Sequence, residues 1–444
     1  MGKSGLLAKL SIAGVATAAL LVIAGFIIQW RSETPSAAAL RLRQIYAQRP
    51  AVRDADNALF DAWGFSAPAG KDSREFGRQR IAWIEKVNAG AADADADPGM
   101  KNANFRGSRR EAMRRAIAAC RSEEARACRD AFERVPPETS PPELEALQIA
   151  RYSAMLTRPA WREIVPLDVA APLPAYVDVM DGQRLLLLSL RAAAAREDSE
   201  AIRATLDRDL KFWRETQKSA DILITKMIAV AAIRQHFRYG NLLLRELPAD
   251  RAVQAIPDSW RVEFAPAERS MLRVFAGELV YFEGMIRTSW AKADQERADA
   301  EDFTDGNIAG RLIDGVPRLV PLQYHVNHLA EIYLAVGEGY EVPLPRYEAA
   351  TRALKAKFAR TGAQWTPEEY AQRVGSLEGV RRAALLTVTL RARGAPAAAV
   401  ADELRSATLR NPFDGAPFEW DANEQAVVYT GPEQHKWRRT EFNY

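Results

Sequence analysis

Two histidines and a glutamate lie close together in a segment whose apolar pattern predicts a helix. In His325-Val-Asn-His328-Leu-Ala-Glu331 these three side chains recur at every third residue. On a helix they lie roughly on one face, as binding of Zn²⁺ by imidazoles and a carboxylate requires. No further firm ligand is identifiable, and the spacing differs from the H-E-x-x-H motif of zinc proteases. We therefore favour a polar helix face and keep a zinc site as the alternative.

A second candidate is Glu278, one of two glutamates on a mainly apolar predicted helix. With Glu283 it could supply the acid and base that cleave a glycosidic bond. Five residues apart on one helix, however, the two side chains point about 140° away from each other. We therefore predict that Glu278 is a buried acid paired with a cation such as Arg273. Catalysis by Glu278 alone is the alternative.

Asp93, Asp95 and Asp97 alternate like the first ligands of a calcium-binding loop. The glycine follows one place late, and Asn104 stands where such a loop has a glutamate, so we interpret the segment as a solvated acidic loop. The sequence contains no Walker A loop, dinucleotide fingerprint, nucleophile elbow or protease zinc motif. No cofactor is therefore predicted.

The sequence has two cysteines, Cys120 and Cys128. On one continuous helix their Cα atoms would lie about 12 Å apart, which is too far for a disulfide. Ser122 followed by two glutamates is typical of a helix start, however. If one helix ends near Cys120 and another begins at Ser122, the two sulfur atoms can meet. We predict a disulfide, with free thiols as the alternative, and no metal site.

An uncharged apolar segment near the N-terminus, residues 10–30, predicts a transmembrane helix. About 20 residues match the ~30 Å hydrocarbon core of a bilayer, with Lys3 and Lys9 before the segment and Trp30 at its end. The alternative is a cleaved signal peptide, but the apolar run is long for one and a cleavage site follows only near Ala37. We expect an uncleaved anchor in a bacterial inner membrane, with the body in the periplasm and the lipid bilayer as a partner of residues 10–30.

The composition bounds the body that follows the anchor. Hydrophobic residues make up 48% of the 444 and charged residues 27%, which suits a folded core and excludes a disordered chain. The 61 basic and 58 acidic residues leave a net charge of only +3, which argues against nucleic acid as a partner.

Helical periodicity dominates the body, so the predicted fold class is mainly α. We expect an irregular array of αα-hairpins, such as 175–195 with 199–217, followed by helices over 220–236, 240–247 and 265–291. The C-terminal end predicts one β-hairpin that pairs 418–420 with 426–429. Five tryptophans are predicted core anchors: Trp83, Trp161, Trp213, Trp260 and Trp290. The predicted units are a cytoplasmic tail (1–9), the transmembrane helix (10–30), a membrane-proximal spacer and helix (31–50), an N-terminal helical unit (51–165), a central one (174–294), a C-terminal one (318–410) and a tail with the hairpin (411–444).

Four segments resemble a group of membrane-anchored envelope proteins of Proteobacteria. They are Asn57-Ala-Leu-Phe-Asp-Ala-Trp-Gly-Phe-Ser-Ala-Pro-Ala-Gly70, Asp209-Leu-Lys-Phe-Trp-Arg214, Lys226-Met-Ile-Ala229 and Asn411-Pro-Phe-Asp-Gly-Ala-Pro-Phe418. The resemblance extends over most of the chain. It implies an envelope location and a helical fold, and it assigns no activity and no functional residue.

These observations favour a protein that binds other envelope proteins over an enzyme. Stacked helical hairpins commonly present extended binding surfaces, and the sequence contains no visible catalytic set. We therefore expect an interaction module or scaffold in the cell envelope. The alternative is a hydrolase of envelope glycan or peptidoglycan that uses an acid such as Glu278.

Overall fold

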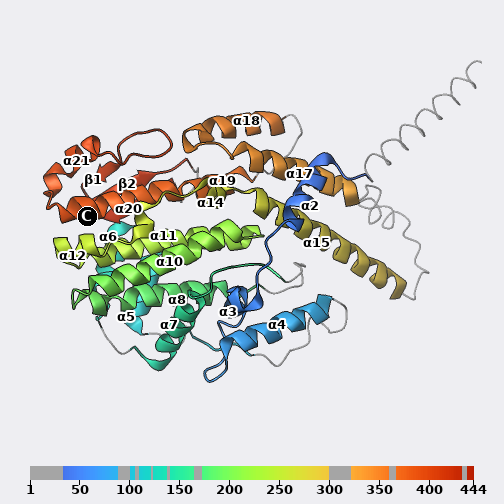
Figure 1. Cartoon of the computed structure of the whole chain (residues 1–444), viewed down its shortest axis with the longest axis horizontal. Helices are drawn as coiled ribbons and strands as arrows, with labels where there is room; N and C mark the ends of the chain where they lie inside the picture. The colour runs from blue at the N-terminus through green and yellow to red at the C-terminus, as the bar shows by residue number, and fades with distance from the viewer. Residues whose placement is uncertain are drawn as a thin grey trace, which may run out of the picture.

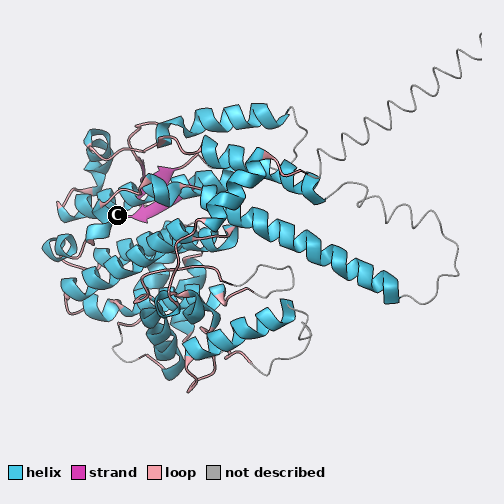
Figure 2. Cartoon of the chain, turned by 45° about the vertical axis from the view of Figure 1, so that its right-hand side comes forward, coloured by secondary structure: helices cyan, strands magenta, loops and turns pink. Residues whose placement is uncertain are grey.

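The computed structural model describes residues 34–88, 101–105, 110–121, 124–137, 141–164, 173–299, 322–359, 367–432 and 438–444. Over these residues the chain is mainly helical, with one small antiparallel sheet near its C-terminal end (Figure 1, Figure 2). The predicted fold class of the body is therefore confirmed. The predicted transmembrane helix lies outside the described residues, and none of the helices within them is long and apolar enough to cross a membrane.

The N-terminal part of the body consists of short helices packed by close backbone contacts. Gly64 and Gly77 let α3 and α4 approach, because a Cβ atom on Gly77 would lie only 2.0 Å from the carbonyl oxygen of Phe60. The helices are α2 (Ala37–Ala47), α3 (Leu59–Trp63), α4 (Ser73–Asn88), α5 (Glu111–Ala119), α6 (Ala125–Glu133), α7 (Glu143–Met155), α8 (Tyr176–Ser189) and α9 (Arg191–Ala194), with a 3₁₀ turn η1 (Asp54–Asp56).

Two long helices, α10 (Ser199–Ser219) and α11 (Leu223–Arg245), form the centre of the body (Figure 1). The predicted start of α10 is confirmed, and the Asp198 side chain caps it by accepting from the backbone N–H of Ala201 at 3.0 Å. The predicted break before Gly240 is wrong, because α11 runs through it. Gly240 lies against the Trp260 ring, where a Cβ atom would come within 2.8 Å of Cζ2, so tertiary packing holds the glycine in the helix.

The C-terminal half adds a longer helix and several short ones. The predicted helix 265–291 is interrupted at Ser270, whose ψ of 137° is extended, and α15 then runs about 42 Å, its far part leaving the body (Figure 2). α15 packs against both α2 and α17. The elements are α12 (Ala249–Gln254), α13 (Asp258–Arg261), α14 (Pro266–Arg269), α15 (Leu272–Asp299), α17 (Leu322–Gly339), η4 (Leu344–Arg346), α18 (Tyr347–Ala359), α19 (Glu368–Gly375), α20 (Leu377–Ala392), η5 (Ala397–Ala399) and α21 (Val400–Ser406).

The sheet has the order β1-β2-β3, with strands Glu419–Asp421, Ala426–Thr430 and Arg439–Asn443. The predicted hairpin is confirmed: Trp420 faces Val427 in the β1–β2 register. The third strand was not predicted, because Phe442 is its only strongly apolar residue. After its first residue, the polar side chains of this strand are buried and form hydrogen bonds to other elements. Thr440, for example, accepts from Arg234 at 3.0 Å.

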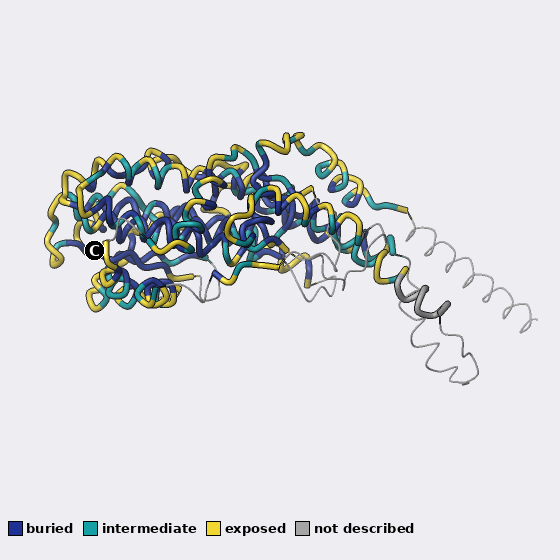
Figure 3. The backbone as a smooth tube through the Cα atoms, turned by 90° about the horizontal axis from the view of Figure 1, so that it is seen from below, coloured by how far each residue is buried: buried dark blue, intermediate teal, exposed yellow. Residues whose placement is uncertain are grey.

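Buried side chains from Ala39 to Phe442 belong to one continuous hydrophobic core. The most deeply buried segments run through the middle of the body, and exposed turns of helix surround them (Figure 3). Three of the five predicted tryptophan anchors, Trp161, Trp213 and Trp260, are at most 1% exposed. Trp83 and Trp290 are half-buried.

Candidate functional site

Glu278 caps a helix from a neighbouring one. α11 begins at Leu223 without a capping side chain of its own, and the Glu278 carboxylate on α15 accepts the backbone N–H of Leu223 at 2.7 Å. Burial raises the pKa of Glu278, and this hydrogen bond lowers it in part. The predicted partner Arg273 instead contacts Asp221, with Nε 2.8 Å from Oδ1. Glu283 pairs with Arg43 at 2.9 Å, away from Glu278.

The three predicted zinc ligands lie on α17 and are only partly brought together. His325 is half-buried beside the ring of Tyr324, while His328 and Glu331 are exposed and line a small cleft of about 220 Å³ with Lys357 of α18. In the described part of the chain, no group of three or more histidine, cysteine or acidic side chains is arranged to hold a metal ion. The alternating aspartates, residues 93–97, lie outside the described residues.

Cys120 and Cys128 form a disulfide, as predicted, with their Cα atoms 4.3 Å apart. α5 ends at Ala119 and α6 begins at Ala125, so the predicted break between two helices is confirmed, although α6 starts three residues later than expected. The eight-residue separation that would keep the sulfur atoms apart on one helix is closed by the turn between two.

The first turn of α6 is held by acids from the C-terminal sheet region. The backbone N–H of Ala125 donates to Glu441 at 3.3 Å, and that of Arg126 donates to Glu424 at 3.2 Å. A carboxylate at a helix N-terminus satisfies N–H groups and favours the helix dipole. The disulfide therefore braces a helix start onto which the last strand docks.

An acid pair that the sequence did not indicate lies where the α10–α11 turn meets the N-terminal segment. Glu163 accepts from Trp161 Nε1 at 3.0 Å and from the backbone N–H of Asp221 at 3.1 Å. The Asp221 oxygens accept from Arg49 at 2.7 Å and Arg273 at 2.8 Å. Burial, and then the charge of Asp221, raises the pKa of Glu163. All four carboxylate oxygens are engaged inside the protein, so the pair joins segments distant in sequence.

A second unpredicted cluster surrounds Asp209 in the middle of the body. His236 Nε2 accepts from Trp260 Nε1 at 2.7 Å, so its Nδ1 carries the proton and donates to Asp209 at 2.7 Å. Gln183 donates to the same carboxylate at 2.9 Å, and the Tyr152 hydroxyl also donates to it. All five side chains have 0% exposure. The cluster specifies the packing of α7, α8, α10, α11 and α13, and no substrate can reach it.

Lys226 on α11 is a buried amine, and no carboxylate oxygen of the described residues lies within hydrogen-bond distance of it. It is 2% exposed, and its Nζ donates to the backbone carbonyls of Gln217 at 2.8 Å and Glu268 at 3.3 Å. Burial, followed by the charge of Arg273, lowers the pKa of Lys226 from 10.5 to about 7. Its amine therefore changes charge near neutral pH.

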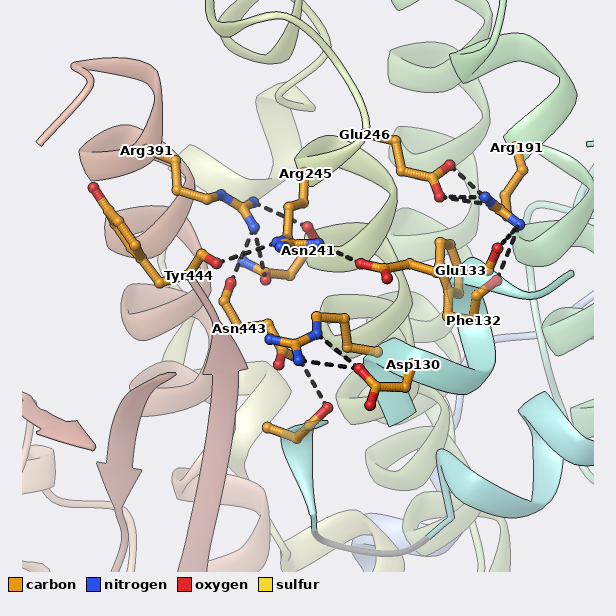
Figure 4. Close-up of polar contacts among 12 residues, drawn as sticks. Asp130, Phe132, Glu133, Arg191, Asn241, Arg245, Glu246, Arg391, Asn443 and Tyr444 are labelled. Carbon is orange, nitrogen blue, oxygen red and sulfur yellow. Dashed lines mark hydrogen bonds and ion pairs between the residues drawn. The ribbon is translucent and has the colours of Figure 1, made fainter. Parts of the chain in front are cut away.

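Arginines anchor the last strand between α11 and α20 (Figure 4). Arg391 donates to the backbone carbonyl of Asn443 at 3.0 Å and to that of Asn241 at 2.9 Å. Arg245 donates to the carbonyl of Tyr444 at 3.1 Å. Burial, and then the charge of Arg245, lowers the pKa of Arg391 to about 9. Arg245 also pairs with Glu133 at 2.5 Å, so the two guanidinium groups join the last strand to α6, α11 and α20.

Two larger clefts are open on the described surface. The first, of about 720 Å³, follows α10 and is lined by four basic and four acidic side chains, several of which pair internally, as Lys211 does with Asp207 at 2.5 Å. The second, of about 590 Å³, lies between the start of α18, the loop 411–418 and the first two strands. Both volumes are in the range of about 300–1,000 Å³ found for ligand sites.

Comparisons with protein-family models, with curated proteins and with solved structures find no match to this chain. Of the residues singled out in the sequence, the structure gives Glu278 a capping role and brings the two cysteines together. It places only His328 and Glu331 of the zinc set in one cleft.

Proposed function

We propose that this chain is an interaction module of a bacterial cell envelope, anchored in the inner membrane by residues 10–30 with its helical body in the periplasm. One observation carries this proposal. Glu278 and Glu163, two acids whose pKa values burial raises, are occupied by internal hydrogen bonds, whereas the two larger clefts are open and lined by side chains of mixed polarity. Such an arrangement suits binding better than acid–base catalysis.

Two further features support the envelope location. A disulfide such as Cys120–Cys128 persists in oxidising compartments, of which the bacterial periplasm is one. Six residues separate the predicted span from α2, and they reach at most about 20 Å. The unit of α2, α15 and α17 would then lie close to the bilayer, with the two larger clefts on the remainder of the body.

Crosslinking in intact envelopes tests the proposal. With an amine-reactive reagent, the full chain is expected to shift from its own 49.3 kDa to a larger discrete species, which disappears when the envelope is dispersed in detergent and diluted before crosslinking. The alternative enzyme is tested on the same material with purified peptidoglycan. A chain that stays at its own mass, together with release of muropeptides that Glu278→Gln abolishes, would overturn the interaction module in favour of a hydrolase.

A further inference from the structure

We infer that the cleft beside the loop 411–418 binds an extended, basic segment of a partner protein. We refer to it as the C-terminal cleft: it is formed by this loop together with the start of α18 and the strands β1 and β2. The inference rests on the proposed function, and it names the part of the surface that makes the contact and the chemistry of the partner.

Two aromatic side chains line the C-terminal cleft, and each packs against a neighbouring aromatic ring. Phe418 is 5% exposed and its ring lies against Tyr429, with centroids 6.3 Å apart. Phe413 is half-buried and contacts the ring of Tyr347 edge-on, with centroids 5.7 Å apart. Since both rings are fixed by aromatic neighbours, the cleft can accept an apolar side chain without rearranging.

The loop that forms one wall is organised before any partner arrives. Asn411 donates from Nδ2 to the carbonyl of Thr430 at 3.2 Å and accepts the backbone N–H of Phe413 at 3.1 Å. Gly415, at a φ of +72°, closes the turn by donating to the Asn411 carbonyl at 3.0 Å. A wall fixed in this way loses little conformational entropy on binding.

The charged side chains that line the C-terminal cleft indicate the charge of the partner segment. Among the described residues, the C-terminal cleft is lined by three carboxylates, Glu348, Asp414 and Glu419, and by one guanidinium, Arg438. The three acids are exposed, so a cation can approach them, and Glu348 also pairs with Arg352 one turn further along α18. Complementary charge favours lysine or arginine side chains at the rim, and it speeds association at low salt. The cleft along α10 has balanced charges and gives no such preference.

The rim also selects the partner's hydrogen-bonding groups. Three of the lining residues are prolines, Pro345, Pro417 and Pro432, which have no backbone N–H to donate but keep their carbonyl oxygens. Together with the three carboxylates they add acceptors to the described lining, in which Arg438 carries the cationic donor. An extended peptide with exposed N–H groups and basic side chains supplies donors for these acceptors, and an acidic or acceptor-rich ligand does not.

Fluorescence anisotropy of a labelled peptide tests the inference on the full chain in detergent. The probe is a nonapeptide of three Lys-Pro-Leu repeats, and its counterpart has three Glu-Pro-Leu repeats. The basic peptide is expected to bind saturably and to weaken with added salt, and the acidic one to show no binding. The double variant Glu348→Lys with Glu419→Lys is expected to weaken binding at least about tenfold. Asp414 is left intact because its Oδ1 accepts the backbone N–H of Ala416 at 2.9 Å.

The matched control is Glu85→Lys with Asp250→Lys, which changes the net charge equally at exposed positions on α4 and α12. It is expected to alter the affinity by less than about twofold. Thermal unfolding of both double variants checks that each is folded. Equal binding of the two peptides, no binding of either, or an equal effect of the two double variants would overturn the inference. If the native chain forms no crosslinked species in intact envelopes, the interaction module itself is contradicted, so the two failures are distinguishable.

Discussion

Replacing Lys226 by methionine removes a buried amine whose hydrogen-bond partners among the described residues are backbone carbonyls. Within the part of the chain that the structure describes, the amine donates to two backbone carbonyls, of Gln217 and Glu268. Its pKa falls from 10.5 to about 7, first through burial and then through the charge of Arg273. Methionine has a similar length and no charge, so the variant reports what this ionisation contributes to stability.

The size of the effect follows from the two pKa values. The unfolded chain keeps the proton up to about pH 10.5, whereas the folded chain releases it near pH 7. Between these values unfolding takes up a proton, so the free energy of unfolding of the native chain rises with pH, by about 1.4 kcal/mol per unit at most. Relative to Lys226→Met, the native chain is expected to gain about 2.5 kcal/mol from about pH 7.5 to about pH 9.5.

Urea unfolding of the full chain in detergent, followed by tryptophan fluorescence at several pH values, measures this difference. Taking the difference between the two proteins cancels every group that they share. The two carbonyls left without a donor lower the stability of the variant by an amount that does not depend on pH, so only the slope carries the argument. Lys355→Met, at an exposed position on α18, controls for the exchange of residue type.

Parallel stability curves for the native chain and Lys226→Met would refute the reasoning. They would mean that Lys226 keeps the same protonation in the folded and unfolded states, so that burial does not act on its amine. A difference that shrinks as the pH rises would refute it more strongly, because the sign of the linkage would then be opposite.

Three further predictions concern the other buried groups. Glu278→Ala is expected to lower the free energy of unfolding by about 1 kcal/mol, because the first N–H of α11 loses its acceptor. Glu278→Gln is expected to lower it by less, because an amide oxygen can still accept. Equal urea midpoints for Glu278→Ala and the native chain would contradict the capping role. His236→Ala is expected to lower the free energy of unfolding by at least about 3 kcal/mol, since Asp209 and Trp260 lose their partner in the core. A decrease no larger than that caused by Arg208→Ala, at an exposed position, would count against the network. The double variant Cys120→Ser with Cys128→Ser is expected to have a free energy of unfolding lower by about 2.5 kcal/mol, because the unfolded chain without the disulfide has a larger entropy. A thermal midpoint equal to that of the oxidised native protein would exclude this contribution.

Local sequence signals predicted the elements where they agreed with the packing. The helical pattern over 199–217 predicted the start of α10, and the β-branched and aromatic residues on both sides of a turn predicted the hairpin. The pattern failed at Gly240, because a glycine that breaks an isolated helix is held in α11 by the Trp260 ring. It failed again at β3, because the buried polar side chains of this strand bind residues far away in the sequence, and the sequence of the strand itself does not indicate these partners.

The candidate site could be predicted only where the interaction is local in sequence. Cys120 and Cys128 are eight residues apart, and a capping pattern between them indicated the break that joins them. Asp221 meets Arg49 across 172 residues, and Asp209 meets His236 on a different helix, so no spacing rule applies to them. Glu278 was predicted to pair with a cation such as Arg273, but its partner is a backbone N–H group that any residue at position 223 except proline would offer.

The most direct test of the envelope location is maleimide-PEG labelling of Cys120 and Cys128 in the full chain. Membranes from the native envelope are washed with alkaline carbonate, denatured, and labelled before and after reduction. Our account predicts that the chain stays with the washed membranes and gains mass only after reduction, because an anchored body in an oxidising compartment keeps its disulfide. A chain released by the wash, or one that is labelled without reductant, would contradict the anchored periplasmic module.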